Sequence, residues 1–284
     1  HPYVEGFVVN ELSRLGSNFR KNEDLNDYLV RNHIPGIQGI DTRALTKLLR
    51  NDGCMNGMIT THKYEVSEVI DKIKAFKVQG VVKACTCKEK HTVGTGRMKV
   101  ALYDFGAKHN IANELAKRNC EVTVFPATTP ASEVLEGNFD GIMLSNGPGD
   151  PAEVTDIIAE VKKLSESGMP IFAICLGHQL MALAHGFKTE KLKYGHHGAN
   201  HPVKDLDTNR VYISTQNHNY VIKDDSIDPA VAKAWFRNVN DGTVEGVEYL
   251  NKNIKTVQFH PEANAGPRDT EYLFDEFIKM MEGK

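Results

Sequence analysis

The chain has 284 residues, with 34 lysines and arginines against 37 aspartates and glutamates and a formal net charge of −3. Apolar residues make up 40% and charged residues 25%, which is typical of a globular protein and excludes disordered, collagen-like and coiled-coil chains. The near-neutral balance predicts neither nucleic acid nor a membrane surface as a partner, and no run of about 18 apolar residues is present that could span a membrane. The length suggests two domains or one large one.

The start of the chain and its cysteines bear on where the protein works. Residues 1–6 contain neither an initiator methionine nor the pattern of a signal peptide, so we expect the natural beginning to be missing. Five cysteines without a secretory signal favour reduced thiols in the cytoplasm.

The first part of the chain, 1–92, mixes elements and is predicted to be a domain of its own. Apolar residues at helical spacing predict a helix over 43–50, with Asp41 as its cap and a stop at 51–53. A second helix is predicted over 67–75. The polar segment 88–97 has no periodicity, and we place the linker to the next domain at 93–97.

From residue 98 to the end of the chain, short apolar strands alternate with helices. Strands are predicted over 99–103, 121–125, 140–145 and 170–174, with helices over 110–118, 154–166 and 178–184. This order indicates a parallel sheet with helices on both faces. Later strands, some antiparallel, are predicted over 210–215, 244–250 and 255–259, and a helix over 270–281 closes the domain 98–284.

Cys175 is a candidate nucleophile, because it stands where a buried strand passes directly into a helix. Small residues at 173 and 177 flank it, as the crowded backbone of a nucleophile elbow requires. The positive end of the helix dipole would favour the thiolate, and the N–H of Leu176 is well placed to hold an oxyanion. The alternative is a small buried cysteine with no chemistry.

A thiolate nucleophile needs a base, and the base needs a group that orients it. His260 follows a predicted strand, and Glu262 stands two positions later across a stiffening proline. Both side chains could therefore reach one site. A capped loop without catalytic function is the alternative.

The segment 145–151 is a third candidate, again at the end of a predicted strand. Two glycines and two prolines fix a tight turn whose N–H groups could bind a phosphate or an oxyanion, although a plain turn is the alternative. No Gly-Lys-Ser/Thr follows it, and the glycines at 94 and 96 precede a strand instead of following one. We therefore expect no ATP site on this chain.

Two groups of residues raise the question of a metal. Residues 195–202 are rich in histidine, and Cys85 and Cys87 lie near His91. Neither group has the paired spacing of a structural zinc site, so we expect a hairpin loop and two unreactive thiols, with no metal.

Taken together, the segments 145–151, 175–179 and 260–262 resemble the motifs of class I, triad-type glutamine amidotransferases. The resemblance covers about residues 98–280. Segments 103–108, 195–203, 216–218 and 266–267 are similar to those of the small, glutaminase subunits of carbamoyl-phosphate synthases. Residues 39–50 are the most telling, because they resemble an N-terminal domain that other class I amidotransferases lack.

The resemblance implies a fold and a set of roles. The fold would be an α/β three-layer class I glutaminase domain with a mostly parallel sheet, preceded by a smaller, truncated α+β domain that docks a large subunit. Cys175 would attack the side-chain amide of L-glutamine, His260 would move the protons, and Glu262 would orient His260. The positions implied to hold glutamine are Gly147, Gly149, Leu176, Gln179, Asn217, Asn219 and Tyr220.

The chain departs from the family pattern at Ala173 and Asn219, where glycine or another small residue is usual, and in lacking a preceding segment whose serine contacts glutamine. Ammonia would pass to the large synthetase subunit, where ATP and metal are expected, so we expect no cofactor on this chain. The alternatives are another class I glutaminase, a silent glutamine-binding or scaffold subunit, and a cysteine peptidase or gamma-glutamyl hydrolase of the same fold.

Overall fold

The computed structural model describes residues 2–283. The chain forms two compact units, His1–Lys77 and Val78–Lys284, each with its own internal packing. None of the helices within the described residues is long and apolar enough to cross a membrane.

Within the described residues, the first unit contains three helices and one small parallel pair of strands. Its helices are α1 (Leu25–Arg31), α2 (Thr42–Asp52) and α3 (Val66–Ala75), and its strands are β1 (Phe7–Val8) and β2 (Gly36–Ile37). The predicted cap of α2 is confirmed, because the Asp41 carboxylate accepts a hydrogen bond from the Ala44 N–H at 2.9 Å. Gly53 ends the helix at φ 93°, a left-handed backbone that favours glycine.

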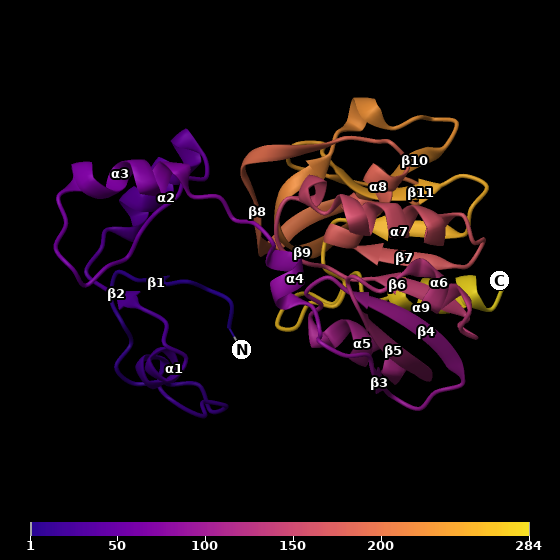
Figure 1. Cartoon of the computed structure of the whole chain (residues 1–284), viewed down its shortest axis with the longest axis horizontal. Coiled ribbons are helices and arrows are strands. Elements are labelled where there is room, and N and C mark those ends of the chain that lie inside the picture. Colours follow the sequence, from indigo (N-terminus) through magenta and orange to yellow (C-terminus); the bar gives the residue numbers. More distant parts are fainter. Residues whose placement is uncertain (1, 284) are drawn as a thin grey trace. The chain divides into compact units, whose positions relative to one another are not determined.

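The second unit is built on one ten-stranded sheet with the order β3-β5-β4-β6-β7-β12-β11-β10-β8-β9 (Figure 1). The strands are β3 (His91–Val93), β4 (Met98–Asp104), β5 (Cys120–Pro126), β6 (Gly141–Leu144), β7 (Ile171–Ile174), β8 (Thr189–Asp205), β9 (Val211–Ile222), β10 (Ala232–Asn238), β11 (Val244–Tyr249) and β12 (Ile254–Val257). Strands β5, β4, β6, β7 and β12 run parallel, and the pairings beyond them are antiparallel. The structure therefore confirms the prediction of a mostly parallel central sheet.

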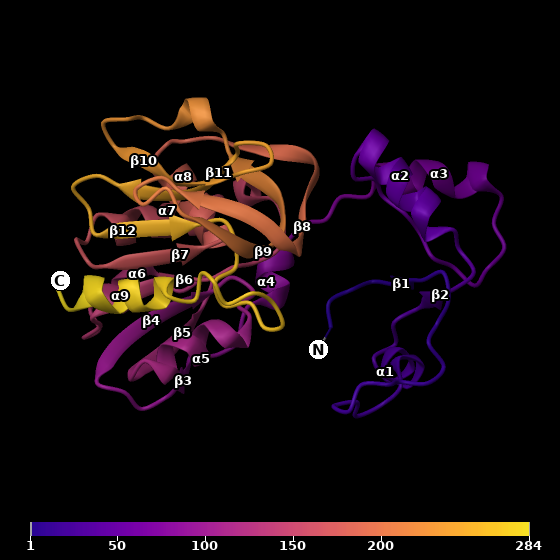
Figure 2. The same cartoon turned by 180° about the vertical axis from the view of Figure 1, so that it is seen from behind.

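Helices cover both faces of this sheet, as Figures 1 and 2 show from opposite sides. The helices are α4 (Val81–Cys85), α5 (His109–Lys117), α6 (Ala131–Leu135), α7 (Thr155–Ser165), α8 (Leu176–Ala184) and α9 (Leu273–Met281). Apolar side chains of α6, α7 and α8 share one core with one face of the strands. Those of α5 and α9 share a second core with the opposite face. The predicted three layers are therefore present.

The division between the units falls earlier than the linker that we predicted at 93–97. Strand β3 pairs with β5, and Val82 of α4 is only 3% exposed within the core of the second unit. These two elements are too short for a periodic pattern to reveal them. Val93 therefore belongs to β3, and residues 94–97 connect two strands of one sheet.

The His-rich segment 195–202 also differs from our prediction. It lies within the long strand β8, paired with β9, where we expected a hairpin loop. The pairing is interrupted between Lys191 and His196 and again between Gly198 and His201, and these irregularities break the alternation that marks a strand in sequence.

Replacement of Phe277 by alanine tests the packing of α9 against the sheet. Its ring is fully buried and stacks on Phe172 with 5.9 Å between the ring centroids. We expect Phe277→Ala to lower the free energy of unfolding of the second unit by about 3–5 kcal/mol. Denaturant titration followed by fluorescence of Trp235, the single tryptophan, measures it. Phe19→Ala is the control, since Phe19 is 91% exposed, and an equal loss there would contradict the packing.

Candidate functional site

Cys175 occupies a strained turn between β7 and α8. Its backbone has φ 52° and ψ −101°, a conformation that non-glycine residues rarely adopt and that functional sites retain. A side chain at Gly177 would bring its Cβ within 2.6 Å of the Leu144 carbonyl oxygen, so the next turn of backbone must pass close to β6. The predicted strand-to-helix turn is therefore present, with the thiol at the N-terminal end of α8.

Hydrogen bonds hold this turn between the two neighbouring strands. The Cys175 N–H donates to the Val257 carbonyl of β12 at 2.8 Å, and the Gly177 N–H donates to the Ser145 carbonyl after β6 at 3.0 Å. The carboxyl ends of three parallel strands thus meet at Cys175, as expected for ligand sites in open α/β sheets.

His260 and Glu262 lie just beyond β12 and contact each other directly. The distance from His260 Nδ1 to Glu262 Oε1 is 2.8 Å, and the two residues are 2% and 1% exposed. Cys175 lies near enough to the same imidazole for its charge to act on the ring, whose Nε2 is buried without a hydrogen-bond partner among the described residues. The structure therefore brings the three predicted residues together in the order thiol, imidazole, carboxylate.

The charges of this trio favour an imidazolium. Burial alone would lower the pKa of His260, but the negative charges of Glu262 and Cys175 raise it to about 9. Burial raises the pKa of Glu262, whereas the His260 charge, the hydrogen bond between them and Lys108 lower it, and the net direction is downward. A positively charged imidazole beside a thiol stabilises the thiolate, which is the nucleophilic form.

Lys108 is a member of the site that motif analysis did not assign. Its Nζ lies 3.3 Å from Glu262 Oε1, and the Asn110 side chain donates a hydrogen bond to the Glu262 carbonyl at 2.6 Å. Both residues follow the carboxyl end of β4. The signal in the sequence was only their place after a predicted parallel strand, which brings them to the same edge of the sheet.

The turn at 145–151 leaves no room for side chains at its glycines. A Cβ on Gly147 would lie 2.3 Å from the Phe105 carbonyl oxygen and 2.7 Å from a methyl group of Leu176, and Gly149 has φ 98°. The turn therefore abuts the start of α8, as an anion-binding turn beside Cys175 requires. Asp150 caps the following 3₁₀ turn by accepting from the Ala152 N–H, so the end of the segment also has a structural role.

The other residues implied to hold glutamine fall into two groups. The Gln179 amide donates to the Tyr220 carbonyl at 2.7 Å and to Gln258 Oε1 at 2.9 Å, so this side chain is fixed by the protein. Burial and a hydrogen bond with Asp150 raise the pKa of the Tyr220 hydroxyl to about 12, and this contact joins β9 to the turn at 145–151.

Asn217 and Asn219 precede Tyr220 in β9, and their side chains flank a histidine of β8. Their side-chain oxygens are 3.0 and 3.2 Å from the two ring nitrogens of His197. The structure thus places them on the strand that carries Tyr220, with their amides directed toward β8.

The remaining cysteines differ from Cys175 in their surroundings. None of the five forms a disulfide within the described residues. Burial and the nearby Asp104 raise the pKa of Cys87 to about 11, and burial and Asp140 raise that of Cys120 to about 11. These thiols stay protonated near neutrality, and neither has an imidazole as a partner.

Comparison with known proteins points to one family for both units. The family model described as glutamine amidotransferase class-I matches residues 101–280, and the one described as carbamoyl-phosphate synthase small chain, CPSase domain, matches residues 1–59. Proteins named carbamoyl phosphate synthase small chain from Clostridium perfringens and Listeria monocytogenes are 48% and 46% identical. The matches cover 98% and 100% of this chain and 78% of each relative.

A solved structure supports the fold of the second unit. A protein from Thermoplasma acidophilum, described as a putative GMP synthase subunit, superposes with a TM-score of 0.58 and 23% sequence identity. The match covers 66% of this chain and 94% of that one. At this level of identity the likeness concerns the fold alone.

Replacement of Glu262 by glutamine tests the charge balance of the site. The carboxylate raises the pKa of His260, so we expect its removal to lower that pKa from about 9 to or below the usual value near 6.5. The imidazolium of the variant would then be lost as pH rises through neutrality, whereas the wild-type ring keeps its charge until about pH 9.

NMR titration of the histidine ring resonances measures this shift. Glu248→Gln is the control, because Glu248 pairs with Lys233 and Lys255 on the sheet surface instead of with a histidine. An unchanged His260 titration in Glu262→Gln would contradict the assigned pair.

Proposed function

The chain belongs to the carbamoyl phosphate synthase small chain family, and from this premise we propose that Cys175, His260 and Glu262 are its catalytic residues. It is the glutaminase subunit of a glutamine-hydrolysing carbamoyl-phosphate synthase, with a class I amidotransferase domain. The observation that carries the assignment of residues is the buried pair of His260 and Glu262 beside Cys175.

The proposed reaction proceeds through a thioester on Cys175. The thiolate attacks the side-chain amide carbon of L-glutamine, and the protonated His260 gives its proton to the leaving nitrogen as the C–N bond breaks. Ammonia leaves, and the glutamyl group remains on sulfur. Neutral His260 then takes a proton from water, which attacks the thioester and releases glutamate. Glu262 holds the ring in place and stabilises its charged form throughout.

Each tetrahedral intermediate carries a negative oxygen that must be stabilised. We assign this role to the Leu176 N–H at the start of α8 and to a glycine N–H from the turn at 147–149. The close approach of Gly147 to both Phe105 and Leu176 supports this, because a donor beside Cys175 is held there without freedom to rotate away.

Substrate binding is assigned to the residues that surround this centre. Gln179, fixed by two hydrogen bonds, and Tyr220, joined to Asp150, form one wall of the proposed glutamine site, with Gly149 beside them. Asn217 and Asn219 lie on the same strand as Tyr220 and are assigned to the far end of the substrate.

A small chain implies that its partner is a large synthetase subunit. We propose that this partner receives the ammonia and binds the ATP and metal used to make carbamoyl phosphate for pyrimidine and arginine synthesis. The glutaminase steps derived above use side chains of this chain alone and no cofactor. We propose that the protein works in the cytoplasm, because five cysteines without a disulfide fit a reducing compartment.

Ammonia release from glutamine tests the proposed function. We expect release by the full chain to rise when a carbamoyl-phosphate synthase large subunit is added, because a gated site avoids wasting glutamine. Cys175→Ser should lower the rate by about 10³-fold or more, since a hydroxyl in this site is a far weaker nucleophile. Cys87→Ser is the matched control and should leave the rate unchanged.

Two outcomes would contradict the proposal. Release that persists in Cys175→Ser would exclude the assigned nucleophile. No release by the wild-type chain, alone or with the large subunit, would favour the alternative of a glutamine-binding scaffold subunit.

A further inference from the structure

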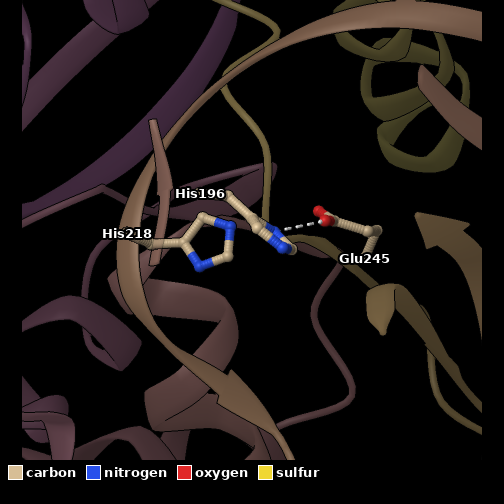
Figure 3. Close-up of side chains that lie close together, drawn as sticks. All are labelled: His196, His218 and Glu245. Atoms are coloured by element: carbon tan, nitrogen blue, oxygen red, sulfur yellow. Dashed lines mark ion pairs between the residues drawn. The ribbon is translucent and has the colours of Figure 1, made fainter. Parts of the chain in front are cut away.

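Three buried side chains from three strands converge in a cluster that contains none of the proposed catalytic residues. His196 of β8, His218 of β9 and Glu245 of β11 are shown in Figure 3, where the two imidazole rings lie side by side and the carboxylate faces the ring of His196. They are 7%, 5% and 0% exposed. One possible ligand atom from each lies within 4.8 Å of the others.

The hydrogen bond of His196 to Asp241 leaves the other ring nitrogen with no hydrogen-bond donor facing it. Its Nε2 lies 2.7 Å from Asp241 Oδ2, and because a carboxylate only accepts, Nε2 carries the proton. In the neutral ring, Nδ1 then presents a lone pair. Nδ1 is buried, has no hydrogen-bond partner and lies 3.4 Å from Glu245 Oε1, so a lone pair faces an anionic oxygen (Figure 3).

His218 has the same mismatch. Its Nδ1 lies 2.9 Å from the Tyr220 carbonyl oxygen and must donate to it, which leaves the Nε2 lone pair 2.8 Å from Gln216 Oε1. The Gln216 amide cannot be reversed without loss, because its Nε2 donates to Glu245 Oε2 at 2.9 Å. Reversal of the amide would place the Gln216 side-chain oxygen against Glu245 Oε2.

A positively charged group would satisfy these lone pairs at the point where they converge. A proton added to His196 alone would meet the Glu245 oxygen, but it would leave the Nε2 lone pair of His218 facing Gln216 Oε1. One shared cation satisfies both rings and the carboxylate at once. Two imidazoles and a carboxylate are a donor set that suits zinc among the divalent metals.

We propose that His196 Nδ1, His218 Nε2 and Glu245 bind a divalent transition-metal ion, zinc by their chemistry, with Gln216 Oε1 as the fourth ligand. The groups behind these ligands match the outer shell of zinc sites, in which the second ring nitrogen donates to a carboxylate or a backbone carbonyl. Asp241 and the Tyr220 carbonyl are those acceptors. Asn238 and Gln216 donate to the two oxygens of Glu245 at 3.0 and 2.9 Å.

The role of this metal is structural. It would fasten β8, β9 and β11 together where the pairing of β8 with β9 is irregular. The Tyr220 carbonyl that orients His218 also accepts from Gln179, so the site supports the wall assigned to glutamine without touching the reacting atoms. The inference uses none of the proposed catalytic residues and stands apart from the glutaminase assignment.

The proposed site departs from our expectation that the His-rich segment binds no metal. Only His196 of that segment takes part, and its partners come from two other strands. The sequence therefore shows none of the close ligand pairs that mark a zinc site.

Zinc binding by the full chain tests the proposal. After removal of metal by chelation, we expect uptake of one zinc ion per chain, measured by elemental analysis and by competition with a chromophoric chelator. Asp241→Asn should weaken affinity by about 10- to 100-fold, because it removes the anionic partner of His196. Asp225→Asn is the matched control, since Asp225 has a 71% exposed side chain and pairs with Lys223.

Cobalt substitution tests the ligands without any variant. A site of nitrogen and oxygen donors gives visible d–d absorption without a thiolate charge-transfer band, and Cys175→Ser should leave the spectrum unchanged. The proposal is overturned by the absence of stoichiometric uptake, by a thiolate band, or by equal affinities in Asp241→Asn and the wild type. The metal test is distinguishable from the glutaminase test, because zinc uptake does not depend on Cys175 and the nucleophile is identified by Cys175→Ser alone.

Discussion

The backbone at Cys175 is hydrogen-bonded to the strands on both sides of it, and the arrangement of the proposed active site depends on these two bonds. The Cys175 N–H bonds to β12, whose continuation carries His260, and the Gly177 N–H bonds to Ser145, where the glycine turn begins. The turn between β7 and α8 thus positions the proposed nucleophile, the base and the turn that would bind the oxyanion. A positive φ at a non-glycine residue costs about 1–3 kcal/mol, and the two apolar cores offset it.

Buried charge is the second constraint on this site. Removing an ion from water costs several kcal/mol, and a pair is tolerated when further hydrogen bonds satisfy it. His260 and Glu262 are paired with each other, and Lys108 adds a positive charge beside Glu262. At His196, His218 and Glu245, each ring directs one nitrogen to a carboxylate or carbonyl acceptor and the other toward an oxygen atom. We propose that these donor atoms bind a divalent cation.

The sequence predicted those features in which local pattern and topology agree. The buried strand that runs into a helix at Cys175, and the strand before His260, are local signals, and parallel topology brings their ends together. The short elements α4 and β3 and the irregular strand β8 lack a periodic signal, so the unit boundary and the His-rich segment were misjudged. Lys108 and Glu245 gain their roles only from three-dimensional contacts between distant strands and loops, which no motif spacing records.

The central claim is that Cys175 is a nucleophile activated by His260. Its most direct test is covalent labelling of the full chain with a diazo-ketone analogue of glutamine, with peptide mass mapping to locate the label. The account predicts labelling of Cys175 that excess glutamine blocks and that His260→Asn slows at least tenfold, which corresponds to about 1.4 kcal/mol or more in the barrier. Labelling at another cysteine, or equal rates in the His260 variant and the wild type, would contradict it.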